Sequence, residues 1–224
     1  MQIIVFIAQK GGTGKTTEAI NLACAALEAG HNPLIIDIDV QASACRWADR
    51  RGDKSPTVID AQPSRLPSAI EKAAEAGFDL VLIDTPAKSG DAGLAAARVA
   101  NLVMIPYRPQ ILDLETIDST KDILHLAGHP EHMAVFNAVP PVGFKRRDDA
   151  MAFLRQYDIP LCPYAISHRA AFGDATALGQ SVLEYEPEGK AAQEIREVYK
   201  HVSQLLGKQE GAIYGATAKA RRIG

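Results

Sequence analysis

The sequence contains few cysteines, and their spacing suggests neither a metal site nor a disulfide framework. Cys24, Cys45 and Cys162 are the only three cysteines in 224 residues. Their number is odd, they lie far apart in the sequence, and no CxxC pair or Cys/His cluster joins them. We therefore expect buried thiols in a reducing compartment. This spacing also argues against an iron–sulfur protein, which needs cysteines placed to hold a cluster.

Long hydrophobic runs are also missing. No stretch approaches the 18 or more apolar residues that can cross a bilayer. The apolar run at residues 1–8 has no basic segment before it and leads directly into a glycine-rich loop, which is unlike a secretory signal. We expect a soluble, cytoplasmic protein that does not bind membranes.

Neither charge sign dominates the sequence. The 24 Lys and Arg against 27 Asp and Glu give a net charge of −3. Residues 1–144 hold 12 basic and 17 acidic side chains (−5), and residues 145–224 hold 12 and 10 (+2). A surface for a polyanion would therefore be local and would lie toward the C-terminal part.

Short apolar runs alternate with longer segments of helical periodicity, and this pattern favours a parallel sheet covered on both faces. We predict an α/β fold with three layers, in which a doubly wound, mostly parallel sheet has helices on both faces. The expected strands are 3–8, 33–37, 57–59, 80–84, 102–106, 134–137 and 159–162. The expected helices are 15–29, 42–51, 66–76, 92–99, 114–126, 148–156, 170–178 and 189–206.

The last residues differ in composition from the rest. Residues 207–224 combine Gly, Ala and basic side chains with little periodicity. We predict one domain over 1–206, followed by a mobile basic tail over 207–224.

The segment Gln9–Thr17 is the most informative part of the sequence. It follows a predicted strand and opens a predicted helix, which is the context of a phosphate-binding loop. Glycines let successive N–H groups point at one anion, and the helix N-terminus favours negative charge. Lys15 would reach the β- and γ-phosphates and Thr16 would ligate Mg²⁺. The predicted nucleotide-binding residues are Lys10, Gly11, Gly12, Thr13, Gly14, Lys15, Thr16 and Thr17.

The sequence Lys-Gly-Gly-Thr-Gly-Lys-Thr-Thr resembles the deviant Walker A motif of the ParA/MinD family of P-loop ATPases. The small single-domain (ParF-like) partition ATPases are the most similar branch. The resemblance implies that ATP or ADP binds with Mg²⁺. It also implies that Lys10 reaches the phosphates of a second subunit in a nucleotide-sandwich dimer. Lys10, Lys15 and Asp39 are then the expected catalytic residues.

Acidic residues at two predicted strand ends match further family motifs. The segment 34–41 resembles the box written DxDPQ, although Val40 stands in place of the proline. The resemblance implies that Asp39 positions the attacking water and that Asp37 supports the metal. Asp84 ends a Walker B strand and is expected to hold Mg²⁺ together with Thr16 and Asp37. Asn137 lies where the family places adenine contacts.

The resemblance implies an ATP-dependent positioning function. An ATP-bound homodimer would bind DNA without sequence preference and would be nucleoid-associated. A ParB/ParG-like adaptor would stimulate slow hydrolysis, and the complex would segregate a plasmid, a chromosome or a protein assembly. Two alternatives remain open: a MinD-like ATPase that acts at the membrane, and a nucleotide-regulated switch with negligible hydrolysis. The expected DNA contacts are Lys145, Arg146, Arg147, Arg169, Lys219, Arg221 and Arg222.

Overall fold

Six parallel strands form the central sheet. The computed structural model describes residues 1–88, 90–110, 116–140, 150–152 and 154–220, and of residues 208–220 it describes the backbone alone. The order of the strands across the sheet is β3-β2-β4-β1-β5-β6. Because β1 lies inside the sheet and the chain winds outward from it in both directions, the predicted doubly wound fold is confirmed. The strands are β1 (Gln2–Phe6), β2 (Pro33–Asp37), β3 (Thr57–Asp60), β4 (Leu80–Asp84), β5 (Leu102–Tyr107) and β6 (His132–Phe136).

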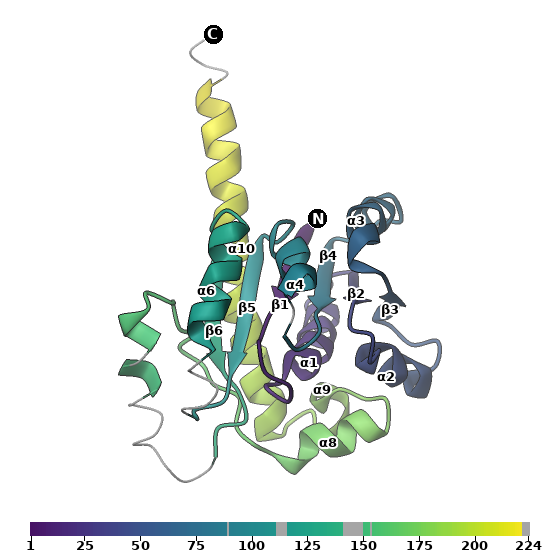
Figure 1. The fold of residues 1–224 in the computed structure, drawn as a ribbon. Coiled ribbons are helices and arrows are strands. Elements are labelled where there is room, and N and C mark those ends of the chain that lie inside the picture. The colour runs from purple at the N-terminus through teal and green to yellow at the C-terminus, as the bar shows by residue number, and fades with distance from the viewer. Residues whose placement is uncertain (89, 111–115, 141–149, 153, 221–224) are drawn as a thin grey trace.

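Helices cover both faces of this sheet (Figure 1). One face carries α1 (Lys15–Glu28), α2 (Ser43–Arg51), α8 (Ala170–Ala177), α9 (Val182–Tyr185) and α10 (Lys190–Ala220). The other face carries α3 (Leu66–Glu75), which the short helix η1 (Pro63–Arg65) precedes, together with α4 (Gly90–Ala97) and α6 (Ile117–Leu126). Residues 150–152 and 154–156 are also helical.

The alternation of side chains along each strand divides the core into two. Ile4 and Phe6 of β1 point to the face covered by α1 and α10, whereas Ile3 and Val5 point to the face covered by α3, α4 and α6. A strand that is buried on both sides has no polar alternation, which is why these runs are almost wholly apolar in the sequence.

The predicted strand at 159–162 is wrong. The structure holds only a single bridge there, between Ala134 and Leu161, with hydrogen bonds from Ala134 N to Pro160 O (2.7 Å) and from Cys162 N to Ala134 O (2.8 Å). Proline has no N–H to donate to a ladder. Pro160 and Pro163 flank the bridge on either side and prevent a longer strand.

The last helix is longer than predicted. It was expected to end at residue 206, but α10 continues to Ala220, and its yellow end extends beyond the rest of the fold in Figure 1. Gly207, Gly211 and Gly215 each disfavour a helix by about 1 kcal/mol. The Ala, Lys, Gln and Glu residues between them are strong helix formers and offset that cost. The division into a domain and a mobile tail at residue 206 stays a prediction.

Candidate functional site

Three strand ends meet at one edge of the sheet. Pairing is parallel, with Phe6 of β1 opposite Asp84 of β4, and Asp84 opposite Asp37 of β2. The phosphate-binding loop, residues 9–14, leaves the end of β1 at the same edge. This register brings the predicted loop and the two acidic motifs together, although they are 20 to 70 residues apart in the sequence. Crevices at the carboxyl ends of parallel strands are where α/β proteins bind ligands.

The backbone of the loop has the conformation that its glycines permit. Gly12 and Gly14 have φ angles of +72° and +110°, a region that other residues rarely adopt. Helix α1 begins directly after Gly14. Gly11 and Gly12 are exposed at the rim, whereas Thr13 and Lys15 are buried on the floor. The loop thus opens outward above the N-terminus of α1, as a phosphate site requires.

The buried position of Lys15 disfavours the charged form of its side chain. Its side chain is only 7 % exposed. Burial lowers the pKa of its ammonium group, and the carboxylates of Asp84 and Asp39 partly restore it. A phosphate would stabilise the charged form much more strongly than these two acids do at a distance.

Asn137 braces the loop, a role that the sequence did not reveal. It follows β6, is 6 % exposed, and its Nδ2 donates to Thr13 O at 2.8 Å. Its Oδ1 accepts from Ala138 N at 2.7 Å. A Cβ on Gly14 would lie 1.5 Å from Asn137 Nδ2, so position 14 must be glycine for this brace to form. The predicted adenine contact of Asn137 stays a prediction.

Thr16 and Asp84 form the centre of the predicted metal site. Thr16 Oγ1 donates to Asp84 Oδ2 at 2.6 Å. Asp84 is 1 % exposed, and its Oδ1 has no hydrogen-bond partner among the described residues. Burial raises the pKa of Asp84 to about 7, against the hydrogen bond from Thr16, which lowers it. A hydroxyl and a carboxylate with a spare buried oxygen are hard ligands of the kind that Mg²⁺ prefers, so these residues fit the ion.

Asp37 and Asp39 have different surroundings. Asp37 is buried and accepts from three backbone N–H groups: Asp39 N at 3.0 Å, Ala44 N at 2.9 Å and Cys45 N at 3.3 Å. Asp37 thus holds the N-terminus of α2 beside the site. Asp39 is half-buried, and its Oδ1 accepts from Gln41 N at 2.9 Å. The roles predicted for Asp37 in metal binding and for Asp39 in positioning water stay predictions.

The DNA contacts predicted from the sequence stay a prediction, because most of these residues lie outside the part of the chain that the structure describes. Lys145, Arg146, Arg147, Arg221 and Arg222 lie outside the described residues, as does the side chain of Lys219. Arg169 is described, and its Nη2 lies 2.6 Å from Glu194 Oε1. Because this carboxylate offsets its charge, Arg169 adds little to a positive surface.

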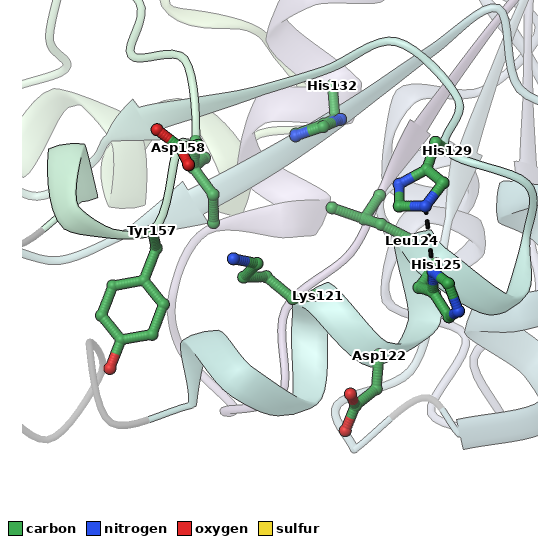
Figure 2. Close-up of a pocket in the computed structure, with 9 residues that line it drawn as sticks. Lys121, Asp122, Leu124, His125, His129, His132, Tyr157 and Asp158 are labelled. Carbon is green, nitrogen blue, oxygen red and sulfur yellow. Dashed lines mark hydrogen bonds between the residues drawn. The ribbon is translucent and has the colours of Figure 1, made fainter.

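One cavity lies at the opposite edge of the sheet, away from the phosphate-binding loop. A dashed line in Figure 2 joins the rings of His125 and His129. Their ring nitrogens are 2.9 Å apart. The cavity has a volume of about 390 Å³, and His132 and Lys121 also line it. His132 begins β6, whereas the phosphate-binding loop follows the end of β1, so the cavity is separate from the site. Within the described ranges, no group of three His, Cys, Asp or Glu residues could hold a metal ion.

Comparisons with known proteins identify the family. The sequence profile of a family described as an AAA domain matches residues 1–62. The maintenance of carboxysome distribution protein A of Gloeobacter kilaueensis is 32 % identical over 209 residues, which are 92 % of this chain and 94 % of that protein. The chain belongs to the ParA/MinD family of P-loop ATPases.

Further ParA/MinD proteins agree with this assignment. The chromosome-partitioning ATPase Soj of Thermus thermophilus is 28 % identical over 143 residues, 51 % of this chain and 57 % of Soj. The MinD protein of Pyrococcus horikoshii, solved with Mg-ADP, has the same fold, with a TM-score of 0.70 and 23 % identity over 92 % of this chain and 97 % of that one. ATP or ADP with Mg²⁺, predicted from the sequence, is confirmed as the ligand of this family.

One structural finding concerns membranes. In the part of the chain that the structure describes, no helix combines the length and the apolar character needed to cross a bilayer.

Proposed function

We propose that this protein is a positioning ATPase that binds ATP and Mg²⁺ at the phosphate-binding loop and the first turn of α1, and that it hydrolyses ATP slowly. The observation that carries the proposal is the hydrogen bond from Thr16 Oγ1 to Asp84 Oδ2, directly beside the buried Lys15. The N-terminus of α1 thus brings together a hydroxyl, a carboxylate and an ammonium group. A nucleoside triphosphate needs these three groups: a hydroxyl to ligate the metal ion, a carboxylate to support the metal site and a positive charge to neutralise the phosphates.

Each site residue has a separate task in this proposal. Thr16 and Asp84 would hold Mg²⁺, which neutralises charge on the phosphates when bound. Lys15 neutralises phosphate in its own subunit. Asp39 orients the attacking water and accepts its proton. Asn137 keeps the loop in shape through Thr13 O. Phosphoryl transfer depends chiefly on positioning and charge neutralisation, which are the tasks that this set of residues would perform.

ATP would control the assembly of the protein. Lys10 is half-buried and directly precedes the exposed Gly11 and Gly12, beside which a second copy would have to approach. We propose that Lys10 reaches the phosphates of that copy, so that ATP favours a sandwich dimer. ATP is then a ligand with a higher affinity for one state of assembly than for the other.

The dimer would connect DNA to a cargo. The relatives include a carboxysome-distribution protein and a chromosome-partitioning ATPase, both named for placing large objects in cells. We propose that the ATP dimer binds DNA without sequence preference in the cytoplasm, on the nucleoid. A ParB/ParG-like adaptor would stimulate hydrolysis and release the dimer. The adaptor would determine whether the cargo is a plasmid, a chromosome or a protein assembly.

Light scattering with added nucleotide tests the proposal. Wild-type protein should be a monomer alone and with ADP-Mg²⁺, and a dimer with ATP-Mg²⁺. Lys15→Ala should lose tight nucleotide binding, by about 10- to 150-fold for one charged hydrogen bond. Lys10→Ala should keep most of its ADP affinity but lose the ATP dimer and hydrolysis. A dimer that forms equally without ATP, or normal ATP-dependent dimerisation of Lys10→Ala, would contradict the sandwich.

Two further measurements separate the alternative functions. Phosphate release with and without DNA identifies a switch with negligible hydrolysis, which would show none in either case. Flotation with anionic vesicles identifies a membrane-bound, MinD-like protein, which would float only with ATP. The proposal expects slow phosphate release that DNA and the adaptor modify, and no flotation.

A further inference from the structure

The arginine that follows β5 lies beside the phosphate-binding loop. Arg108 comes directly after Tyr107, the last residue of β5. A Cβ built on Gly12 would lie 3.9 Å from Arg108 Nη1, so the guanidinium group is next to the rim of the loop. No sequence motif contains Arg108, which lies 93 positions after Lys15 in the chain.

The register of the sheet explains this proximity. Strand β5 pairs with β1 in parallel, with Met104 opposite Phe6, and Ile7 N donates to Met104 O at 3.0 Å. Strand β5 then continues for three more residues, while the chain after β1 turns into the loop. Arg108, which follows the end of β5, therefore lies level with the phosphate-binding loop.

The backbone at Arg108 is held firmly. Pro109 follows it, and a residue before proline is restricted to extended conformations. Tyr107 is buried, and its carbonyl oxygen accepts from Asn137 N at 2.8 Å. Arg108 is itself half-buried. Asn137 therefore contacts both the loop, through Thr13, and the residue that precedes Arg108.

Arg108 and the acidic residues lie on opposite sides of the loop. In the strand order, β4 and β2 lie on one side of β1 and carry Asp84 and Asp37, whereas β5 lies on the other side and carries Arg108. The metal-binding side of the site is thus separate from the arginine side. A guanidinium group stays charged at any physiological pH and presents a planar set of donors that suits phosphate oxygens.

We propose that Arg108 binds the terminal phosphate of ATP from the side opposite Asp84 and stabilises the charge on that phosphate during hydrolysis. The inference rests on the proposed ATP site and deepens it. Gly12, which Arg108 adjoins, belongs to the exposed rim rather than to the buried floor formed by Thr13 and Lys15. A guanidinium group at the rim would contact the outermost phosphate of the nucleotide. ATP has this phosphate and ADP lacks it.

Nucleotide affinity without magnesium tests this contact most directly. Fluorescent analogues of ATP and ADP are titrated in EDTA against wild type, Arg108→Ala, Arg108→Lys and the control Arg98→Ala. Arg98 is an exposed arginine before β5, at the other edge of the sheet. Arg108→Ala should weaken binding of the ATP analogue by about 10-fold or more and leave the ADP analogue within about threefold. Arg108→Lys should be intermediate, and Arg98→Ala should match wild type.

Hydrolysis and stability complete the test. With Mg²⁺, kcat of Arg108→Ala should fall by a larger factor than KM rises, because the contact is strongest in the transition state. The thermal midpoint without nucleotide should equal that of wild type. Unchanged ATP affinity would overturn the inference, as would an equal loss of ATP and ADP affinity, which would indicate a structural role. If wild type bound neither analogue, both the proposed function and the inference would fail.

Discussion

Glu18 is a buried acid without a partner, one turn into α1. It is 0 % exposed, and neither carboxylate oxygen has a hydrogen-bond partner among the described residues. Burial raises the pKa of Glu18 well above its usual value, so the folded state disfavours the ionised carboxyl more than the unfolded chain does. The unfolded chain ionises it freely at neutral pH. Glu18 therefore destabilises the native state.

Replacing Glu18 by an apolar side chain of similar length should stabilise the protein. Glu18→Met should raise the free energy of unfolding at pH 7 by about 1–3 kcal/mol, because no polar group is then taken out of water. Urea unfolding followed by circular dichroism measures this change. Glu28→Met, at the exposed end of the same helix, makes the same change of helix propensity but breaks the 2.9 Å ion pair between Glu28 and Arg196, so it should not stabilise. A less stable Glu18→Met protein would mean that the carboxyl makes an interaction essential to the fold.

Alanine substitutions of Asp39 and Asp37 should affect different properties, namely the rate of hydrolysis and the thermal stability. Asp39→Ala should bind ATP and dimerise but hydrolyse about 10²- to 10⁴-fold more slowly, as expected for a group that positions water and accepts its proton. Asp37→Ala should instead lower the thermal midpoint without nucleotide, because the N–H group of Asp39 and two N–H groups in the first turn of α2 lose their acceptor. Phosphate release and thermal unfolding of the two variants separate these roles. Wild-type turnover by Asp39→Ala would move the water-positioning role elsewhere.

The sequence predicted those site residues whose roles follow from local motifs. Lys15, Thr16 and Asp84 were expected together, and the structure joins Thr16 to Asp84. The brace from Asn137 to Thr13 and the approach of Arg108 to Gly12 could not be predicted. Both depend on the order of β1, β5 and β6 across the sheet, and no single segment of sequence encodes that order.

Helices α2 and α9 are joined by one arginine. Arg51 of α2 donates from Nη2 to Glu184 Oε1 at 2.7 Å and from Nη1 to Gly179 O at 3.0 Å, and its guanidinium carbon lies 4.9 Å from the centre of the Trp47 ring. The side chain of Arg51 is only 5 % exposed. Ser181 and Glu184 also form a capping box at the start of α9. Arg51 is thus part of the fold, not of a free basic surface.

The Arg51–Glu184 pair should make stability depend on pH in the acid range. Burial alone would raise the pKa of Glu184, but hydrogen bonds from Arg51 and Ser181 lower it below its usual value. A lowered pKa stabilises the fold above the unfolded value of 4.5, and this stabilisation is lost as the pH falls through the folded value. Glu184→Gln should cost about 1–2 kcal/mol at pH 7 and much less at pH 3. A difference from wild type that is constant with pH would contradict this account.

The ends of helices and strands could be predicted where a residue such as glycine terminates the element locally. The end of α1 near Gly30, with its φ of +88°, matched the prediction to within one residue. The prediction of a strand at 159–162 was wrong. The apolar residues there favour a strand, but the two prolines have no N–H groups for the hydrogen bonds of a longer one. The full length of α10 could not be predicted, because three glycines after residue 206 disfavour a helix while the residues between them favour one.

At the scale of the whole molecule, DNA binding requires a local positive surface, because the net charge is −3. Lys145, Arg146 and Arg147 are the densest basic run, although Asp148 and Asp149 follow directly. A monomer offers few phosphate contacts and a dimer offers twice as many. Each added contact steepens the dependence of log affinity on log salt by about 0.9. We therefore expect DNA binding that requires ATP and falls steeply as salt rises.

A mobility-shift series over salt concentration tests this expectation with ATP, with ADP and without nucleotide. The proteins are wild type, the triple variant Lys145→Ala/Arg146→Ala/Arg147→Ala, and a truncation after Gln209 that removes Lys219, Arg221 and Arg222. Each variant should bind more weakly on every DNA sequence and have a shallower salt slope, because lost phosphate contacts carry no sequence information.

Equal retention of DNA by all three proteins would place the contact elsewhere. Since Arg51 and Arg169 are engaged by Glu184 and Glu194, the exposed Arg46 would then be the next position to test. Absence of binding in every nucleotide state would exclude DNA as the surface on which this ATPase acts.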